Sequence, residues 1–321
     1  VMTLGILFGC SKDGGEKGSG GKGGKKDTII IATMAEPPTL SPTEQNAIAS
    51  SYMNALTFSQ LTRMNEDMEM EGALAESFEN TSETEWVFHL RKGVKFHNGE
   101  EMTADDVVTS ITYAKTCPEV NLYNASVEKI EKVDDYTVKI TTPGPSAILL
   151  SDLAHHGNAI IPKKLLDEGH NFSTDPIGTG PYKHVEWKRG DSLEFEMFED
   201  YWDEEHMPSI KHMIWKIIPE GSSRTIALEA GEVDFIVEVE SMDADRLKEN
   251  SDITVLQYND TSHNWLMLNN EAPGLDNQDV RHAINSAIDK ESVVTVAYNG
   301  LATPSWTATP SNFPGTTDET A

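Results

Sequence analysis

"WVFHLRKGVKFHNGEEMTADDVVTSITYAK", residues 86–115, contains a strand pattern followed by a helix pattern. Large apolar side chains fall on every second residue from Trp86 to Leu90, as expected for a strand with one buried face. A Lys-Gly pair at 92–93 and an Asn-Gly pair at 98–99 are turn signals. Together these features predict a β-hairpin over the first half of the stretch.

The second half of the stretch predicts an amphipathic helix that begins after Thr103. Thr103 and Asp106 have the three-residue spacing of a capping box, in which each residue satisfies a backbone N–H of the first turn. The residues that follow form an apolar stripe at helical spacing, namely Val107, Val108, Ile111 and Ala114. Strand and helix patterns therefore lie next to each other in this part of the chain.

Towards the N-terminus, TIIIAT at 28–33 is a continuous β-branched run, which is typical of a strand covered on both faces. The run ends before Glu36, Pro37 and Pro38, and the prolines cannot continue a hydrogen-bonded ladder. In open α/β sheets, ligands bind at loops that follow the carboxyl ends of strands. Glu36 and Pro38 are therefore candidate ligand contacts.

Strand and helix patterns alternate through the rest of the chain, which predicts an α/β fold. The predicted strands are 136–140, 193–197, 214–218, 233–237 and 265–268. One predicted helix runs from Ser222 to Gly231, and a second carries Val280, Ile284, Ala287 and Ile288 on one face. A third helix ends at Gly300.

Three separated segments resemble successive signatures of one protein family. They are LAESFENTSETEWVFHLRKGVKFHNGEEMTADDVVTSI (74–111), PIGTGPYKHVEW (176–187) and LNNEAPGLDNQDVRHAINSAIDKESVV (268–294). The family is solute-binding protein family 5, the dipeptide-, oligopeptide- and nickel-binding lipoproteins of ABC importers. The resemblance covers nearly all of the chain from Thr28 onward.

The resemblance implies a two-lobed α/β body of the periplasmic-binding-protein type II, with an extra subdomain inserted in the first lobe. It implies no covalent chemistry and no cofactor. The expected boundaries are lobe I at 28–261, its inserted subdomain at about 61–172, and lobe II from 262. Only about fifty residues follow Trp265, whereas a lobe with its own core needs about a hundred. The second lobe is therefore expected to be incomplete in this chain.

The first ten residues resemble the end of a signal peptide. LFGC at 7–10 is similar to the lipobox of bacterial lipoproteins, so Cys10 is predicted to be lipidated; the alternative is an incidental cysteine. Residues 11–27 follow as a Gly- and Lys-rich tether that has almost no apolar surface to bury. These features predict a protein held by lipid on the extracytoplasmic face of a cell membrane.

Composition excludes some partners. The chain has 321 residues, and its 53 acidic against 25 basic side chains give a formal charge of −28. Such a charge repels phosphate, so nucleic acid is not an expected partner. If Cys10 carries lipid, Cys117 is the other of only two cysteines, and no internal disulfide is expected.

Further ligand contacts are predicted in loops and at strand ends. Tyr123 lies in a loop after the capped helix, and His155 lies in LAHHGNAIIPKK, which resembles a family segment that runs beside the cleft. After the crossover between lobes, Asn264 and Trp265 begin a predicted strand, and Trp306 lies in a proline-flanked loop. Aromatic surface with polar groups at its edge suits a small-ligand site.

The predicted function is the capture of short peptides for delivery to the transmembrane subunits of an ABC permease. Nickel, a metal chelate or an oligosaccharide are alternative ligands within the family. A metal site at His155-His156 is not favoured, because adjacent residues on a strand point to opposite faces. A secreted hydrolase is disfavoured because the chain lacks G-x-S-x-G and H-E-x-x-H motifs.

Overall fold

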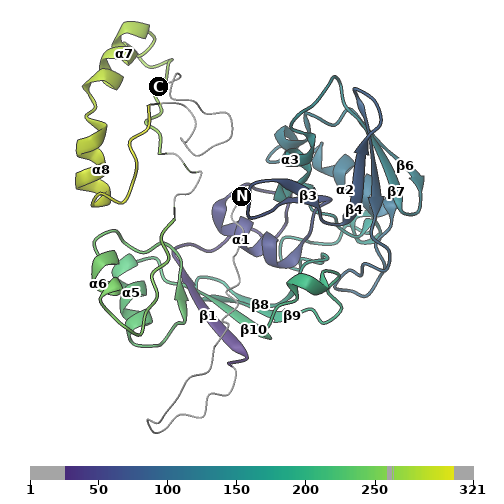
Figure 1. The fold of residues 1–321 in the computed structure, drawn as a ribbon, viewed down its shortest axis with the longest axis horizontal. Coiled ribbons are helices and arrows are strands. Elements are labelled where there is room, and N and C mark those ends of the chain that lie inside the picture. Colours follow the sequence, from purple (N-terminus) through teal and green to yellow (C-terminus); the bar gives the residue numbers. More distant parts are fainter. Residues whose placement is uncertain (1–25, 259–261, 263, 307–321) are drawn as a thin grey trace. The chain divides into compact units, whose positions relative to one another are not determined.

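The computed structural model describes residues 26–258, 262 and 264–306 (Figure 1). The chain divides into two compact units, one up to Val237 and one from Glu238. Cys10 and nearly all of the tether lie outside the described residues. The predicted lobe boundaries and the bounds of the inserted subdomain stay predictions.

The first unit contains a five-stranded sheet with the order β11-β1-β10-β9-β8 (Figure 1). β1 is parallel to its two neighbours, β10 and β11, whereas β9 and β8 run antiparallel to the strands beside them. The bounds are β1 Thr28–Thr33, β8 Tyr182–Lys188, β9 Ser192–Met197, β10 His212–Ile217 and β11 Phe235–Ile236. The strands predicted at 28–33, 193–197 and 214–218 are confirmed, and the one at 233–237 is shorter than predicted.

Helix α1 (Ile48–Thr57) packs its apolar side chains against this sheet. Met53 and Leu56 join a buried cluster with Ile31 of β1 and Trp215 of β10. The ring of Tyr52 stacks on Trp215 at a centroid distance of 5.6 Å. Helix α5 (Gly221–Glu229) confirms the helix predicted from Ser222, and Gly231 after it has a φ of +71°, as a glycine that ends a helix commonly does.

A second, four-stranded sheet has the order β4-β5-β7-β6, and all its pairs are antiparallel. Its bounds are β4 Ala75–Asn80, β5 Glu85–Leu90, β6 Lys129–Asp134 and β7 Thr137–Thr141. The strand predicted at 136–140 is β7. A two-stranded ribbon of β2 (Thr62–Met64) and β3 (Met70–Gly72) precedes this sheet in the chain.

The hairpin predicted over 86–99 is wrong. β5 forms, but its two partners are β4 and β7, which occupy both of its edges. The chain does turn after Leu90, yet the residues beyond form only an isolated bridge between Lys95 and Glu101. Val94 and Phe96 are buried in the core instead of extending a ladder. The apolar residues that alternate after the turn at 92–93 are therefore core residues of a loop and do not form the second strand of a hairpin.

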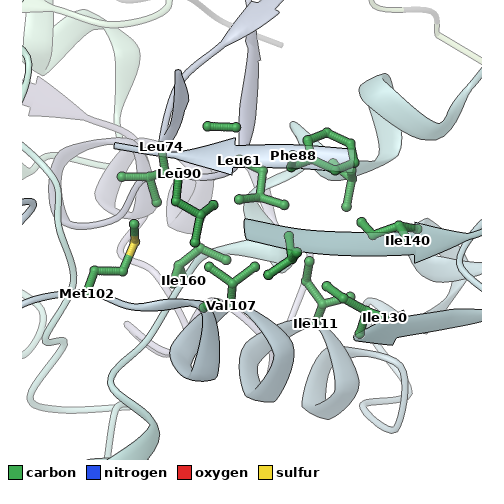
Figure 2. Packing of buried hydrophobic residues seen from close by; sticks show 14 of the residues in the cluster. Leu61, Leu74, Phe88, Leu90, Met102, Val107, Ile111, Ile130, Ile140 and Ile160 are labelled. Carbon is green, nitrogen blue, oxygen red and sulfur yellow. The ribbon is translucent and has the colours of Figure 1, made fainter. Parts of the chain in front are cut away.

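Helix α2 (Ala104–Ala114) is the helix predicted after Thr103. The Asp106 carboxylate accepts a hydrogen bond from the Thr103 backbone N–H at 2.8 Å, which is the carboxylate half of the predicted capping box. Val107 and Ile111 are fully buried. In Figure 2 they point from the helix towards the strands that carry Phe88 and Ile140. The strand, the loop and the helix of the stretch 86–115 therefore contribute side chains to the same hydrophobic core.

Several short helical elements lie between the strands of the first unit. They are η1 Asn121–Asn124, α3 Leu149–Leu153, η2 His156–Asn158, α4 Lys163–Asp167 and η3 Glu204–His206. In the segment between α4 and β8, a Cβ on Gly178 would lie 2.1 Å from the carbonyl oxygen of Thr57. A Cβ on Gly180 would lie 2.4 Å from that of Leu56. Only glycine allows this close backbone approach.

The second unit contains α6 (Ala244–Lys248), α7 (Gln278–Ala287) and α8 (Lys290–Tyr298). The two helices predicted after residue 270 are confirmed, and Asn299 with Gly300 ends α8 in the left-handed conformation. The strand predicted at 265–268 is wrong, since these residues form no strand and pair with none within the described part of the chain. Met267 is 89% exposed, so no sheet covers this run of apolar residues. No helix among the described residues combines the length and apolarity needed to cross a membrane.

Candidate functional site

The loop from 34 to 47 begins where β1 ends and leads into α1. Because β1, β10 and β11 are parallel, their carboxyl ends lie at the same edge of the sheet. This edge is where open α/β sheets bind ligands. The loop carries two of the predicted contacts, Glu36 and Pro38.

Glu36 is engaged within the protein. Its Oε2 accepts hydrogen bonds from the Trp187 indole N–H at 3.1 Å and from the Gly190 backbone N–H at 3.0 Å. The Arg189 guanidinium lies 3.3 Å from the centroid of the Trp187 ring, a cation–π contact. Glu36 thus fixes the turn between β8 and β9. A ligand role for Glu36 and for the exposed Pro38 stays a prediction.

Tyr123 and His155 are brought together. Tyr123 lies on η1 and His155 caps η2, and their rings stack with centroids 3.4 Å apart and planes within 12°. The His155 Nδ1 accepts a hydrogen bond from the Gly157 backbone N–H at 3.1 Å. The expectation that His155 and His156 point to opposite faces is wrong, because they lie at the start of a 3₁₀ turn. Their ring centroids are only 4.1 Å apart.

Side chains from the loop after β1 and from α1 complete the cluster. Asn46 donates a hydrogen bond from Nδ2 to the Tyr123 hydroxyl at 2.8 Å. Ser51 on α1 places its Oγ 3.4 Å from Nδ1 of His156. Asn158 donates to the Tyr123 carbonyl oxygen at 3.1 Å. Three segments distant in sequence therefore meet around the stacked rings.

The predicted contacts did not include Asn46, Ser51 and Asn158, and of the His155-His156 pair they named only His155. Asn46 lies in the loop that follows the carboxyl end of β1, and His156 and Asn158 lie in the LAHHGNAIIPKK segment, so a signal pointed to each of them. Ser51 carries no such signal, and its position depends on how η2 packs against α1. The cluster of Asn46, Ser51, Tyr123, His155, His156 and Asn158 is called the histidine–tyrosine cluster below.

Both histidines of the cluster are neutral at pH 7. Burial, with a smaller contribution from the neighbouring His156, lowers the pKa of His155 to about 3. Burial also lowers the pKa of His156 to about 4. A neutral imidazole offers one N–H donor and one acceptor. Two buried nitrogens, Nε2 of His156 and Nε2 of Gln45, have no hydrogen-bond partner within the part of the chain that the structure describes.

The predicted contacts in the second unit lie at its surface. Asn264 donates a hydrogen bond to the Tyr298 hydroxyl at 2.8 Å. Trp265 and Trp306 are each 61% exposed. The Lys290 ammonium lies 4.2 Å from the Trp306 ring centroid. A ligand role for these three residues stays a prediction.

The described residues contain no group of three or more His, Cys, Asp or Glu side chains placed to hold a metal ion. Cys117 is buried and free, with its Sγ 3.4 Å from the Tyr113 carbonyl oxygen. The histidine–tyrosine cluster combines stacked, half-buried aromatic rings with neutral hydrogen-bonding groups beside them. Such a surface suits reversible binding of a small organic molecule.

Comparisons with known proteins agree with this architecture. A glutathione-binding protein, GsiB of Pectobacterium atrosepticum, is 30% identical over 281 residues, which cover 86% of this chain and 54% of that protein. Helicobacter pylori DppA, an ABC transporter-associated periplasmic binding protein solved with the peptide STSA, matches with a TM-score of 0.79 and 26% identity. That match covers 88% of this chain and 60% of DppA.

Campylobacter jejuni NikZ, solved with Ni(L-His), matches with a TM-score of 0.74 and 30% identity over 86% of this chain and 56% of NikZ. The chain spans about half the length of the curated relatives it matches. The family model of bacterial extracellular solute-binding proteins, family 5 Middle, matches residues 69–321. The chain therefore belongs to the family 5 bacterial extracellular solute-binding proteins and has their periplasmic-binding-protein-like α/β fold.

Proposed function

We propose that this protein is the substrate-binding component of an ABC importer and that it captures short peptides outside the cytoplasm. It delivers them unchanged to the transmembrane subunits of the permease. Family membership supports the general role. The observation that carries the peptide assignment is the stack of Tyr123 on His155, 3.4 Å between centroids, with neutral hydrogen-bonding groups beside it.

Peptides suit this surface for two physical reasons. An aromatic face gains free energy by contact with aliphatic and planar groups of a ligand, including the peptide unit itself. Peptide units also carry one N–H and one carbonyl, which suit the neutral imidazole, amide and hydroxyl groups of the cluster. Two relatives are described as binding a peptide or glutathione, which is itself a short peptide.

A second candidate is a nickel chelate. It is favoured by the two neutral histidine rings 4.1 Å apart and by the unpartnered Nε2 of His156. The relative NikZ was solved with Ni(L-His). A pair of histidines leaves most of the coordination sphere of a transition metal to other ligands, so a chelator would have to supply them. Peptide capture needs no such addition and is the main proposal.

The attachment to the membrane is proposed from the sequence around Cys10. A lipobox-like LFGC followed by a Gly- and Lys-rich segment fits a lipidated cysteine with a flexible tether. The place of action would then be the extracytoplasmic face of the cell membrane.

Changing Cys10→Ser is expected to move the protein from the membrane fraction to the soluble fraction, because the acyl chains have no other attachment point. Immunoblots of the two fractions measure the distribution. Cys117→Ser is the matched control and should leave the protein with the membrane. A Cys10→Ser protein that stays in the membrane fraction would contradict lipid attachment at this residue.

Changing Tyr123→Leu is expected to weaken binding of the peptide Ser-Thr-Ser-Ala about fivefold, since one aromatic contact contributes about 1 kcal/mol beyond buried area. Calorimetry measures the affinity, and mass spectrometry checks that the peptide is recovered intact. Tyr136→Leu is the control, because Tyr136 bonds to Glu101 outside the cluster. Equal affinities for both variants, or cleavage of the peptide, would contradict the proposal.

The pKa values of the two cluster histidines predict how the protein responds to acid. Unfolded histidine titrates near 6.5, whereas folded His155 and His156 titrate at about 3 and about 4. Between these values the unfolded chain binds more protons, so the stability contributed by the neutral rings falls as pH drops from 6.5 towards 4. Histidine NMR shifts followed against pH measure each pKa. A midpoint near 6.5 for either ring would contradict the buried, neutral pair.

A further inference from the structure

A partly enclosed cavity of about 230 Å³ lies on the first unit, and no member of the histidine–tyrosine cluster lines it. Its walls come from the loop after β1, from Tyr113 on α2, from Leu166 on α4, and from the segment that follows α4. One water molecule occupies about 30 Å³ in the liquid. The cavity therefore has room for a molecule of several non-hydrogen atoms.

Glu44 is solvent-exposed and lines this cavity with its carboxylate. Its Oε2 accepts hydrogen bonds from the Ser173 hydroxyl at 2.6 Å and from the Thr39 hydroxyl at 3.3 Å. These bonds hold the carboxylate in one orientation. Oε1 receives no hydrogen bond, and no Lys or Arg pairs with Glu44, among residues 26–258, 262 and 264–306.

The rest of the lining combines neutral hydroxyl groups with an apolar wall. The Tyr113 hydroxyl hydrogen-bonds with Thr43, and burial raises the pKa of Tyr113, so it is a neutral phenol. Leu166 and Phe172 supply aliphatic and aromatic surface. The other titratable group of the lining, His170, places its Nε2 2.8 Å from the carbonyl oxygen of Asp175.

A ligand that matches this lining carries an ammonium group on a short hydrocarbon chain. An ammonium has three N–H donors and no acceptor, which matches one carboxylate oxygen flanked by hydroxyl oxygens. A carboxylate or phosphate ligand would be repelled by Glu44. A neutral alcohol would fill the apolar part but would gain no ionic attraction to the carboxylate.

We propose that this cavity is a second small-molecule site that binds a compact primary alkylammonium, with Glu44 Oε1 as the acceptor and Leu166 and Phe172 against the hydrocarbon. The site is separate from peptide capture and goes beyond the proposed function. The loop after β1 contributes to both sites, because Asn46, two residues after Glu44, donates a hydrogen bond to Tyr123 of the histidine–tyrosine cluster.

The test uses n-butylammonium as the probe and n-butanol as the neutral molecule of matched size. Titrations are followed by backbone amide NMR of the whole chain, without any peptide. The expected result is saturable shifts at Thr43, Tyr113 and Asn171 with butylammonium, and an association constant about threefold to fivefold lower for butanol. Glu44→Gln should lower the butylammonium constant by a similar factor.

Glu119→Gln is the matched control, because it removes one exposed carboxylate that does not line the cavity, and it should leave the constant unchanged. If Glu44→Gln does not fold, two other measurements test whether the cavity binds the ammonium. They are the affinity of Tyr113→Phe and the comparison of butylammonium with butanol. Tyr113→Phe should lower the constant severalfold. Equal binding of amine and alcohol, no saturable shift at the cavity, or an equal loss in Glu119→Gln would overturn the proposal.

Discussion

The parallel pairing of β1 with a strand on each side is the constraint on which the rest of the first unit depends. Ile31 of β1 lies opposite Trp215 of β10 and opposite Phe235 of β11, so both edges of the strand are occupied. The point at which the chain leaves the sheet is therefore fixed. The loop from 34 to 47 starts there and carries Glu36, Glu44 and Asn46, which take part in three different contacts.

A second constraint joins the two sheets of this unit. The chain passes so close to the end of α1 that Gly178 and Gly180 have no room for a side chain. His97, from the stretch 86–115, donates its backbone N–H to the Gly178 carbonyl oxygen at 2.8 Å and places Nε2 3.0 Å from that of Gly180. Burial lowers the pKa of His97 to about 4, so its ring is neutral in this contact. The contact links the core around Phe88 to the sheet around β1.

The sequence was sufficient to predict the elements whose signals are local. The capping pair Thr103 and Asp106 predicted the start of α2, and the β-branched run at 28–33 predicted β1. It was insufficient where the partner of a segment lies far away in the chain. Residues 86–99 read as a hairpin because nothing local reveals that β4 and β7 occupy both edges of β5. The apolar run at 265–268 reads as a strand, although no neighbouring strand is described.

The same distinction holds for the candidate site. Tyr123 and His155 were predicted separately, and the structure brings them into a stack. The contacts of Asn46 and Ser51 depend on the packing of α1 against η2, which no spacing in the sequence encodes. Glu36 looked like a ligand contact from its position after β1, but hydrogen bonds to Trp187 and Gly190 engage one of its oxygens.

A captured solute is proposed to lie on the histidine–tyrosine cluster. NMR of the protein with ¹³C-labelled histidine, while the peptide Ser-Thr-Ser-Ala is added to saturation, tests this most directly. The resonances of His155 and His156 are expected to move together, because both rings belong to the cluster. The resonance of His184, which packs on Phe195 in the five-stranded sheet, should stay in place. Saturable peptide binding that leaves both cluster histidines unmoved would contradict a solute site at this cluster.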